Sequence, residues 1–192
     1  MEQKIFSGKV VVITGAGQGI GFEIARQLCL QGASVVLNDK DTKLAESAVA
    51  RIQKEDGICL GLAGDAGDPS FIQKLTDTAI EKFGGLHIAI ANAGITLFGD
   101  FFTYPAESLQ QVMKLNMGGS FLLAQSAAIQ MRKQGSGGSI LLMSSVTGHQ
   151  AHRHLAAYAM TKSALQMMAR NLVIELSPFQ ITINAIAPGA TI

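Results

Sequence analysis

Three side chains in the C-terminal part of this 192-residue chain have the types and spacing for acid–base chemistry on an oxygen atom. Tyr158 and Lys162 are four residues apart, so on a helix they share one face. A free tyrosine has a pKa of about 10, and a neighbouring ammonium stabilises its phenolate. Such a tyrosine can take a proton from an alcohol or donate one to a carbonyl. Ser145, thirteen residues before Tyr158, can hydrogen-bond the reacting oxygen.

A glycine-rich turn gives a second chemical signal. It follows the apolar run Val10–Ile13 and precedes a segment with helical spacing of apolar residues. Glycines let the backbone approach a pyrophosphate closely, and the start of a helix offers free N–H groups and a positive dipole end. The alternatives are an ordinary strand-to-helix turn and, for Tyr-x-x-x-Lys taken alone, a surface helix pair. The combination favours a dinucleotide site with these candidates: Gly15, Gln18, Gly19, Ile20 and Gly21.

Asp39 indicates which dinucleotide binds. It ends the second apolar run, eighteen residues after Gly21, where an acid can accept hydrogen bonds from the adenosine ribose hydroxyls and repel a 2′-phosphate. Gln18 is not basic, whereas the adjacent Lys40 is a positive charge that argues the other way. The alternative for Asp39 is a turn residue at the end of a strand. NAD is therefore predicted in preference to NADP.

Short apolar runs alternate with segments of helical periodicity along the whole chain. Alternating strands and helices form right-handed βαβ units and a mostly parallel sheet. We therefore expect an α/β fold with a doubly wound parallel sheet, helices on both faces, and one domain over residues 1–192. The expected strands are residues 9–14, 33–37, 58–62, 86–91, 138–144 and 181–187, and the expected helices are 19–32, 42–55, 69–83, 109–132 and 156–175.

Composition excludes several other classes of protein. Hydrophobic residues make up 48% and charged residues 15%, which is typical of a globular chain. The net charge of +1 gives no reason to expect nucleic acid or a membrane as partner. Cys29 and Cys59 have no metal-ligand spacing, residues 1–6 have no apolar signal core, and no apolar run is long enough to cross a bilayer. A reduced cytoplasmic protein without a metal site is predicted.

Taken in order, these motifs resemble those of the short-chain dehydrogenase/reductase family. That family has a Thr-Gly-x-x-x-Gly-x-Gly turn, matched by residues 14–21, and an Asn-Ala-Gly turn after the fourth strand, matched by residues 92–94. It also has an Asn in the following long helix, a Ser thirteen residues before Tyr-x-x-x-Lys, and a Pro-Gly after the sixth strand. The resemblance covers essentially the whole chain. It implies a Rossmann-like fold and NAD-dependent interconversion of a secondary alcohol and a ketone.

The resemblance also implies roles for individual residues. Lys162 would hold the nicotinamide ribose, and Asn116 would support a water-mediated proton relay. Asp65 and Ala66 would lie near the adenine, although a turn-forming Asp explains that segment nearly as well. The remaining implied cofactor contacts are Asn92, Ala93 and Gly94 near the ribose, and Pro188 and Gly189 near the nicotinamide. Members also form homo-oligomers, here expected through the long helices around Asn116 and Tyr158.

Departures from the family pattern leave other functions open. His87 and Ala91 stand where the family often has Asp and Asn, which is expected to weaken details that support the fold. Family members continue past Pro-Gly with a substrate segment, a helix and a strand, whereas this sequence stops at Ile192. The alternatives are a catalytically impaired dinucleotide-binding or interaction protein and an NADPH-dependent 3-oxoacyl reductase.

A histidine-rich segment lies between Ser145 and Tyr158. A metal site formed by His149, His152 and His154 is disfavoured, because no carboxylate or cysteine accompanies them and hydride transfer needs no metal. The segment resembles the family's substrate-pocket wall, and a solvated loop and a polar substrate contact are equally compatible with it. The predicted partner is a small alcohol or ketone, and the polar histidine segment suggests a sugar or another polyol.

Overall fold

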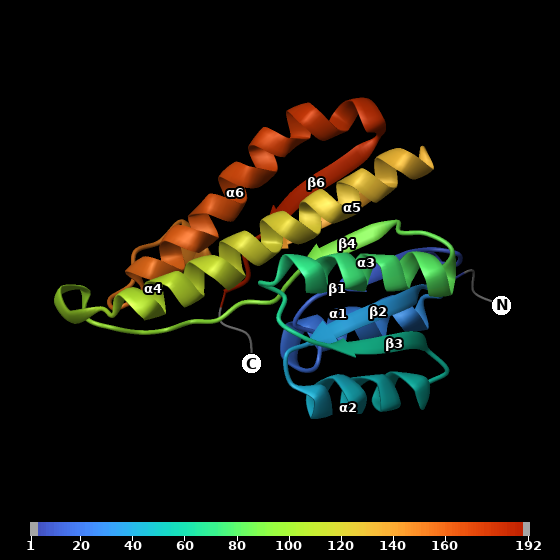
Figure 1. Cartoon of the computed structure of the whole chain (residues 1–192), viewed down its shortest axis with the longest axis horizontal. Coiled ribbons are helices and arrows are strands. Elements are labelled where there is room, and N and C mark those ends of the chain that lie inside the picture. Colours follow the sequence, from blue (N-terminus) through green and yellow to red (C-terminus); the bar gives the residue numbers. More distant parts are fainter. Residues whose placement is uncertain (1–3, 190–192) are drawn as a thin grey trace.

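The computed structural model of the protein describes residues 4–189 and contains one six-stranded sheet (Figure 1). The strand order is β3-β2-β1-β4-β5-β6, and each neighbouring pair is parallel. The chain therefore starts in the middle of the sheet, winds outward to β3, returns to the middle and winds outward to β6. This arrangement confirms the predicted doubly wound α/β fold. The strands are β1 (Val10–Ile13), β2 (Ser34–Asp39), β3 (Ile58–Ala63), β4 (Ile88–Ala91), β5 (Gly138–Met143) and β6 (Ile181–Ile186).

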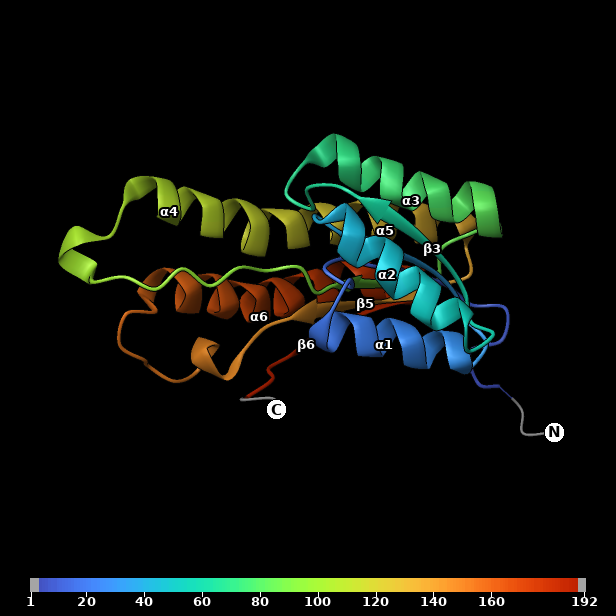
Figure 2. The same cartoon turned by 90° about the horizontal axis from the view of Figure 1, so that it is seen from below.

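Helices cover both faces of the sheet, and this explains why β1 is apolar throughout. Val11 and Ile13 pack with α1 and α2, whereas Val10 and Val12 pack with α3, α5 and α6 on the other face. Figure 2 shows α1 and α3 on opposite sides of the sheet. Among residues 4–189, no helix is long and apolar enough to cross a membrane. The helices that form these two layers are α1 (Gly19–Leu30), α2 (Thr42–Gln53), α3 (Pro69–Phe83), α5 (Ser120–Gln134) and α6 (Ala156–Leu176).

The boundaries of α2 and α3 follow from local chemistry. Asp41 and Asp68 cap the two N-termini, and the side chain of each accepts hydrogen bonds from backbone N–H groups of the first turn. Pro69 follows as the first residue of α3, where its missing N–H costs nothing. Gly84 ends α3 with a φ of 84°, a left-handed conformation that glycine adopts without a steric penalty.

The long helical segment before β5 differs from the prediction. The periodicity predicts one helix over 109–132, whereas the structure has α4 (Ala106–Val112), a π-helical turn (Met113–Gly119) and α5. The helix starts earlier because the extended Pro105 precedes it and Glu107 occupies the first turn, where an acid is favourable. The spacing of apolar residues does not reveal a short π-helical segment inside a longer helix. In proteins such segments frequently lie at functional sites.

His87, which stands where the family often has Asp, forms two hydrogen bonds with the first residue of β1. The imidazole Nδ1 of His87 accepts a hydrogen bond from the main-chain N–H of Val10 at 3.0 Å. The main-chain N–H of His87 donates to the carbonyl of Val10 at 2.9 Å. Burial, together with the charge of Lys9, holds the pKa of His87 below its usual value, so the neutral form that can accept this bond is favoured. The imidazole therefore supplies the acceptor that the first N–H of β1 requires.

Candidate active site

The candidate site lies at the carboxyl ends of the strands, around the point where the winding reverses. β1 and β4 are neighbours, but the chain leaves them toward opposite edges of the sheet. Turns that leave adjacent strands in opposite directions open a crevice between them. Two hollows occupy this crevice, one of about 270 Å³ beside β2 and one of about 200 Å³ beside α6. Asn92 and Gly94 line both hollows, so the two are adjacent.

The glycine-rich turn packs tightly against the turn after β4. Gly15 has a φ of 63°, and a Cβ on it would lie 2.7 Å from Cα of Ala93. A Cβ on Gly21 would collide with the side-chain amide of Asn92 and the carbonyl of Gly15. Gln18, which precedes α1, forms no side-chain cap. The first N–H groups of α1 are therefore free of a side-chain cap and available to an anion.

Hydrogen bonds also join the two turns. The Thr14 hydroxyl accepts from the N–H groups of Asn92 and Ala93 at 3.2 and 3.1 Å. In return, the side-chain amide of Asn92 donates to the carbonyls of Thr14 and Gly15 at 3.0 and 2.8 Å. The sequence predicted both turns as cofactor contacts, and the structure brings them together.

Asp39 lies at the end of β2 with its carboxylate held in place. One oxygen accepts from the N–H of Gly17 at 3.0 Å and the other from the N–H of Asp41 at 3.1 Å. A Cβ on Gly17 would lie 2.6 Å from the carboxylate oxygen, so glycine is what allows this approach. Asp39 and Lys40 both line the hollow beside β2. The negative charge that favours NAD and the positive charge that argues for NADP therefore both border this hollow.

Asp65 and Ala66 form another part of this hollow, after β3. The Asp65 carboxylate accepts from the N–H of Gly67 at 2.8 Å and from the Lys114 ammonium at 2.9 Å. The Gly67 bond and the Lys114 pair hold the pKa of Asp65 below its usual value. Sequence reasoning missed Lys114, since its partner lies 49 residues away and nothing local signals the pair.

Ser145, Tyr158 and Lys162 line the second hollow together with Ile20, Pro188 and Gly189. The Ser145 hydroxyl accepts a hydrogen bond from the N–H of Thr147 at 3.2 Å, which leaves its proton free to point elsewhere. The Lys162 ammonium lies 5.5 Å from the centre of the Tyr158 ring. The structure thus brings together the three residues that the sequence selected for acid–base chemistry.

Lys162 is held at both ends. Its ammonium donates to the carbonyl of Met143 at 2.6 Å, and its own carbonyl accepts from the Ser144 hydroxyl at 2.7 Å. The residue is only 4% exposed, and burial lowers the pKa of its ammonium to about 8. Neither Met143, the last residue of β5, nor Ser144, which directly precedes Ser145, was singled out from the sequence.

Asn116 is fully buried in the π-helical turn. Its side-chain oxygen accepts from the N–H of Ile95 at 2.8 Å, and its amide donates to the Ile95 carbonyl at 2.9 Å. The same amide donates to the Thr161 hydroxyl at 3.2 Å. The side chain therefore braces the segment after β4 against α6, and a role in a proton relay stays a prediction.

The histidines do not converge. Among residues 4–189, no group of three His, Cys, Asp or Glu side chains could hold a metal ion. His149 lines a separate hollow between α6 and β6, not the one that contains Tyr158. His154 has a φ of 63°, and its carbonyl accepts from the N–H of Gly99, which joins its loop to the segment after β4. A substrate contact by these histidines stays a prediction.

Residues 9–192 match a protein family described as short chain dehydrogenase. The chain belongs to the short-chain dehydrogenase family. It is 34% identical to L-rhamnose-1-dehydrogenase of Scheffersomyces stipitis over 189 residues, covering 96% of this chain and 73% of the relative. It is 39% identical to versicolorin reductase stcU of Emericella nidulans over 186 residues, covering 95% of this chain and 69% of the relative. Both are oxidoreductases by name, and their substrates differ.

Solved structures of family members agree with this assignment. A short-chain type dehydrogenase/reductase from Mycobacterium marinum is 31% identical with a TM-score of 0.93, and the match covers 98% of this chain and 77% of that one. An NAD⁺-bound xylitol dehydrogenase is 28% identical with a TM-score of 0.92, covering 96% and 71%. A gluconate 5-dehydrogenase from Burkholderia cenocepacia, in complex with NADP and tartrate, is 28% identical with a TM-score of 0.90, covering 98% and 73%. The family thus binds either dinucleotide on this fold.

The buried ammonium of Lys162 predicts a pH-dependent cost in stability. Its pKa falls from 10.5 to about 8 on folding, so below pH 8 the folded chain carries a buried charge that costs roughly 3 kcal/mol. Between about pH 8 and 10.5 the unfolded chain binds more protons, so stability rises with pH. The free energy of unfolding of Lys162→Met relative to wild type should therefore be greatest near pH 7 and become smaller by about pH 9.5.

Urea unfolding of both proteins between about pH 7 and pH 9.5 measures this difference. Lys74→Met is the matched control, because Lys74 is an exposed lysine on α3 and its replacement should leave the curve parallel to that of wild type. A gain in Lys162→Met that stays constant across this pH range contradicts a lowered pKa for Lys162.

Proposed function

We propose that this chain is an NAD-dependent oxidoreductase that interconverts a secondary alcohol and a ketone, with Tyr158 as general acid and base. The observation that carries the proposal is the adjacency of the two hollows. The one lined by Asp39 and Asp65 suits an adenosine, and the one lined by Ser145 and Tyr158 suits a reacting oxygen. A dinucleotide that spans both would place its nicotinamide end next to Tyr158.

The residues of the second hollow divide the chemistry among them. A bound nicotinamide dinucleotide supplies or accepts the hydride. In its hydrogen bond with the N–H of Thr147, the Ser145 hydroxyl is the acceptor, so its proton is not used there. That proton can be donated to the substrate oxygen. Tyr158 exchanges a proton with the same oxygen, and the Lys162 ammonium beneath its ring stabilises the phenolate.

Replacing Tyr158 tests this assignment. Tyr158→Phe removes the proton-transferring hydroxyl and should lower kcat for reduction of a ketone panel with NADH by at least about 10²-fold, with NADH affinity retained. The reverse reaction is measured as oxidation of secondary alcohols, polyols and sugars with NAD. These compounds are chosen because three of the similar proteins are named for L-rhamnose, xylitol or gluconate.

Tyr104→Phe is the matched control for this experiment, because it removes the other tyrosine hydroxyl, which donates to the Leu97 carbonyl outside the second hollow. The control should retain turnover. Equal turnover by Tyr158→Phe and wild type would contradict the proposed role, and a wild-type chain that binds NADH but turns over no substrate would favour a non-catalytic dinucleotide-binding protein.

Asp39 supports NAD as the preferred cofactor. Its carboxylate is fixed by Gly17 and Asp41 at the end of β2, and each oxygen retains a lone pair for a ribose hydroxyl. The same charge disfavours a 2′-phosphate, although Lys40 beside it partly offsets this.

Asp39→Ser should weaken NADH binding by at least about tenfold, since a charged hydrogen bond contributes about 1.5–3 kcal/mol, and it should strengthen NADPH binding. Fluorescence titrations give both dissociation constants. Asp41→Asn is the control, because it removes one negative charge two residues away and keeps a side chain that caps α2. If the control changes the NADH to NADPH ratio as strongly as Asp39→Ser, general electrostatics and not Asp39 sets the preference.

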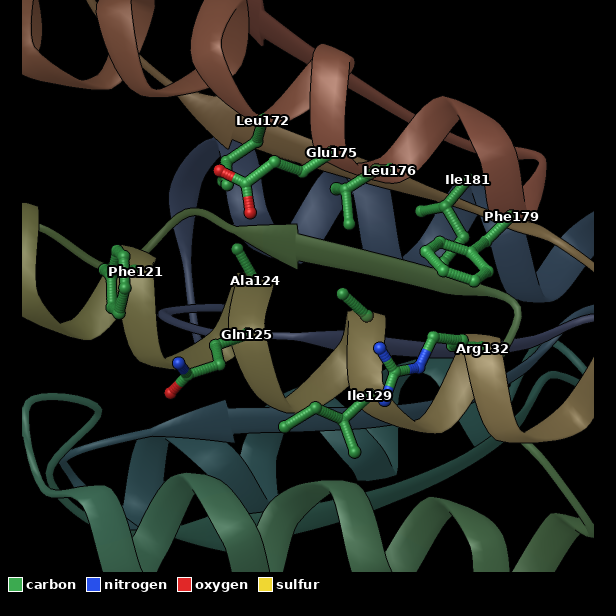
Figure 3. Close-up of a pocket in the computed structure, with 11 residues that line it drawn as sticks. Phe121, Ala124, Gln125, Ile129, Arg132, Leu172, Glu175, Leu176, Phe179 and Ile181 are labelled. Atoms are coloured by element: carbon green, nitrogen blue, oxygen red, sulfur yellow. The ribbon is translucent and has the colours of Figure 1, made fainter.

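The outer face of the long helices supports a homo-oligomer. A groove of about 450 Å³ runs between α5 and α6 (Figure 3). Phe121, Ile129 and Phe179 line it and are 45%, 60% and 42% exposed. Arg132 on α5 and Glu175 on α6 also line the groove, and within residues 4–189 neither forms an ion pair. A two-fold axis could pair Arg132 of each copy with Glu175 of the other.

Sedimentation velocity measures this association. Wild type should sediment as a dimer or larger, and Ile129→Glu should sediment as a monomer, because association would bury a carboxylate in the groove. Ile58→Glu on β3 is the control, since Ile58 is 58% exposed on a different surface and its replacement should leave the assembly intact. A monomeric wild type would contradict the proposed interface.

A further inference from the structure

Thr161 has a buried hydroxyl that the chemistry above does not use. It lies one residue before Lys162 in the second turn of α6 and is 2% exposed. A hydroxyl removed from water is costly unless it is hydrogen-bonded. Here it is bonded on both sides, and each partner belongs to a different part of the candidate site.

The two hydrogen bonds connect the π-helical turn to the helix that carries Tyr158. The Thr161 hydroxyl donates to the main-chain carbonyl of Tyr158 at 2.7 Å and accepts from the side-chain amide of Asn116 at 3.2 Å. Asn116 is itself fixed to both backbone groups of Ile95. A continuous path of hydrogen bonds therefore runs from the segment after β4, through Asn116 and Thr161, to the backbone of Tyr158.

This path of hydrogen bonds ends at Tyr158, the residue that is proposed to transfer the proton. The Tyr158 side chain is only half-buried, so packing alone fixes it less firmly than the buried Lys162. A Cβ on Gly94 would lie 3.2 Å from the Asn116 oxygen and 3.4 Å from the Lys162 ammonium, so Asn116 and Lys162 approach the same glycine. Movement of Asn116 relative to α6 would therefore change how Tyr158 and Lys162 face the hollow.

We propose that Thr161 is a positioning residue for Tyr158, whose hydroxyl fixes the first turns of α6 to the side chain of Asn116. The proposal rests on the proposed function, because the position of Tyr158 affects a rate only if Tyr158 transfers the proton. Thr161 itself touches no reacting atom. Its loss should change the placement of Tyr158 and leave the dinucleotide hollow beside β2 intact.

Thr161→Val removes both hydrogen bonds at nearly constant volume. We expect kcat to fall about tenfold, since small displacements of a reacting group have large effects on rate, while KM for NADH changes by less than about twofold. Thr161→Ser keeps the hydroxyl and should restore most of the activity. Should Thr161→Val fail to fold, Thr161→Ala removes the same hydroxyl with less crowding.

A spectroscopic measurement tests the placement of Tyr158 without turnover. The chain has two tyrosines, so labelling with 3-fluorotyrosine gives two ¹⁹F resonances, and Tyr104→Phe assigns the one from Tyr158. Thr161→Val should move the Tyr158 resonance, whereas Thr161→Ser should leave it close to wild type.

Thr76→Val is the matched structural control. Thr76 is a buried helical threonine, 1% exposed, whose hydroxyl bonds to the Gln73 carbonyl at 2.9 Å and to the Ser126 hydroxyl of another helix at 2.8 Å. The Thr76→Val protein should lose stability as Thr161→Val does, but its Tyr158 resonance and its kcat should be unchanged.

Several outcomes would overturn the proposal. An unmoved Tyr158 resonance in Thr161→Val would do so, as would an equal effect of Thr76→Val, or a Thr161→Ser protein that resembles Thr161→Val. Absence of turnover in the wild-type chain would instead contradict the proposed function, and the ¹⁹F spectra would still decide whether Thr161 positions Tyr158.

Discussion

The contact between the turns after β1 and β4 is the constraint on which the site depends. A crevice opens where the connections after two adjacent parallel strands leave in opposite directions, and its width is defined only if its two sides are joined. Here Thr14 and Asn92 join the two turns with hydrogen bonds in both directions. The turns pack so closely that a side chain on Gly15 or Gly21 would collide with neighbouring atoms. Both hollows are built outward from this contact, so their separation is set by backbone geometry.

The fold and most of the site could be predicted because their signals are local. A buried parallel strand is a short apolar run, and Val10–Ile13 is apolar on both faces because helices cover both. Helical spacing places Tyr158 and Lys162 on one face of α6, and Ser145 together with the glycine-rich turn favoured a chemical role for the pair. Gly15 to Gly21 could be placed because a strand and a helix flank them in the sequence.

The parts that escaped prediction depend on contacts between distant segments. Lys114 meets Asp65 across 49 residues, and Asn116 meets Thr161 across 45, with no periodicity to reveal either pair. The π-helical turn at Asn116 is a local change of pitch that apolar spacing does not report. His87 was also not predicted as a hydrogen-bond partner, because the N–H of Val10 that it accepts from lies 77 residues away.

Binding of the dinucleotide is the claim on which every proposed role depends. A titration of NADH with the purified chain, with NADPH in parallel, tests it directly by the emission of the reduced nicotinamide, and the protein contains no Trp to interfere. The account predicts saturable binding with a clear preference for NADH. A folded chain that binds neither dinucleotide would contradict it, since the joined turns, Asp39 and the Ser145–Tyr158–Lys162 set would then form a crevice that serves another purpose.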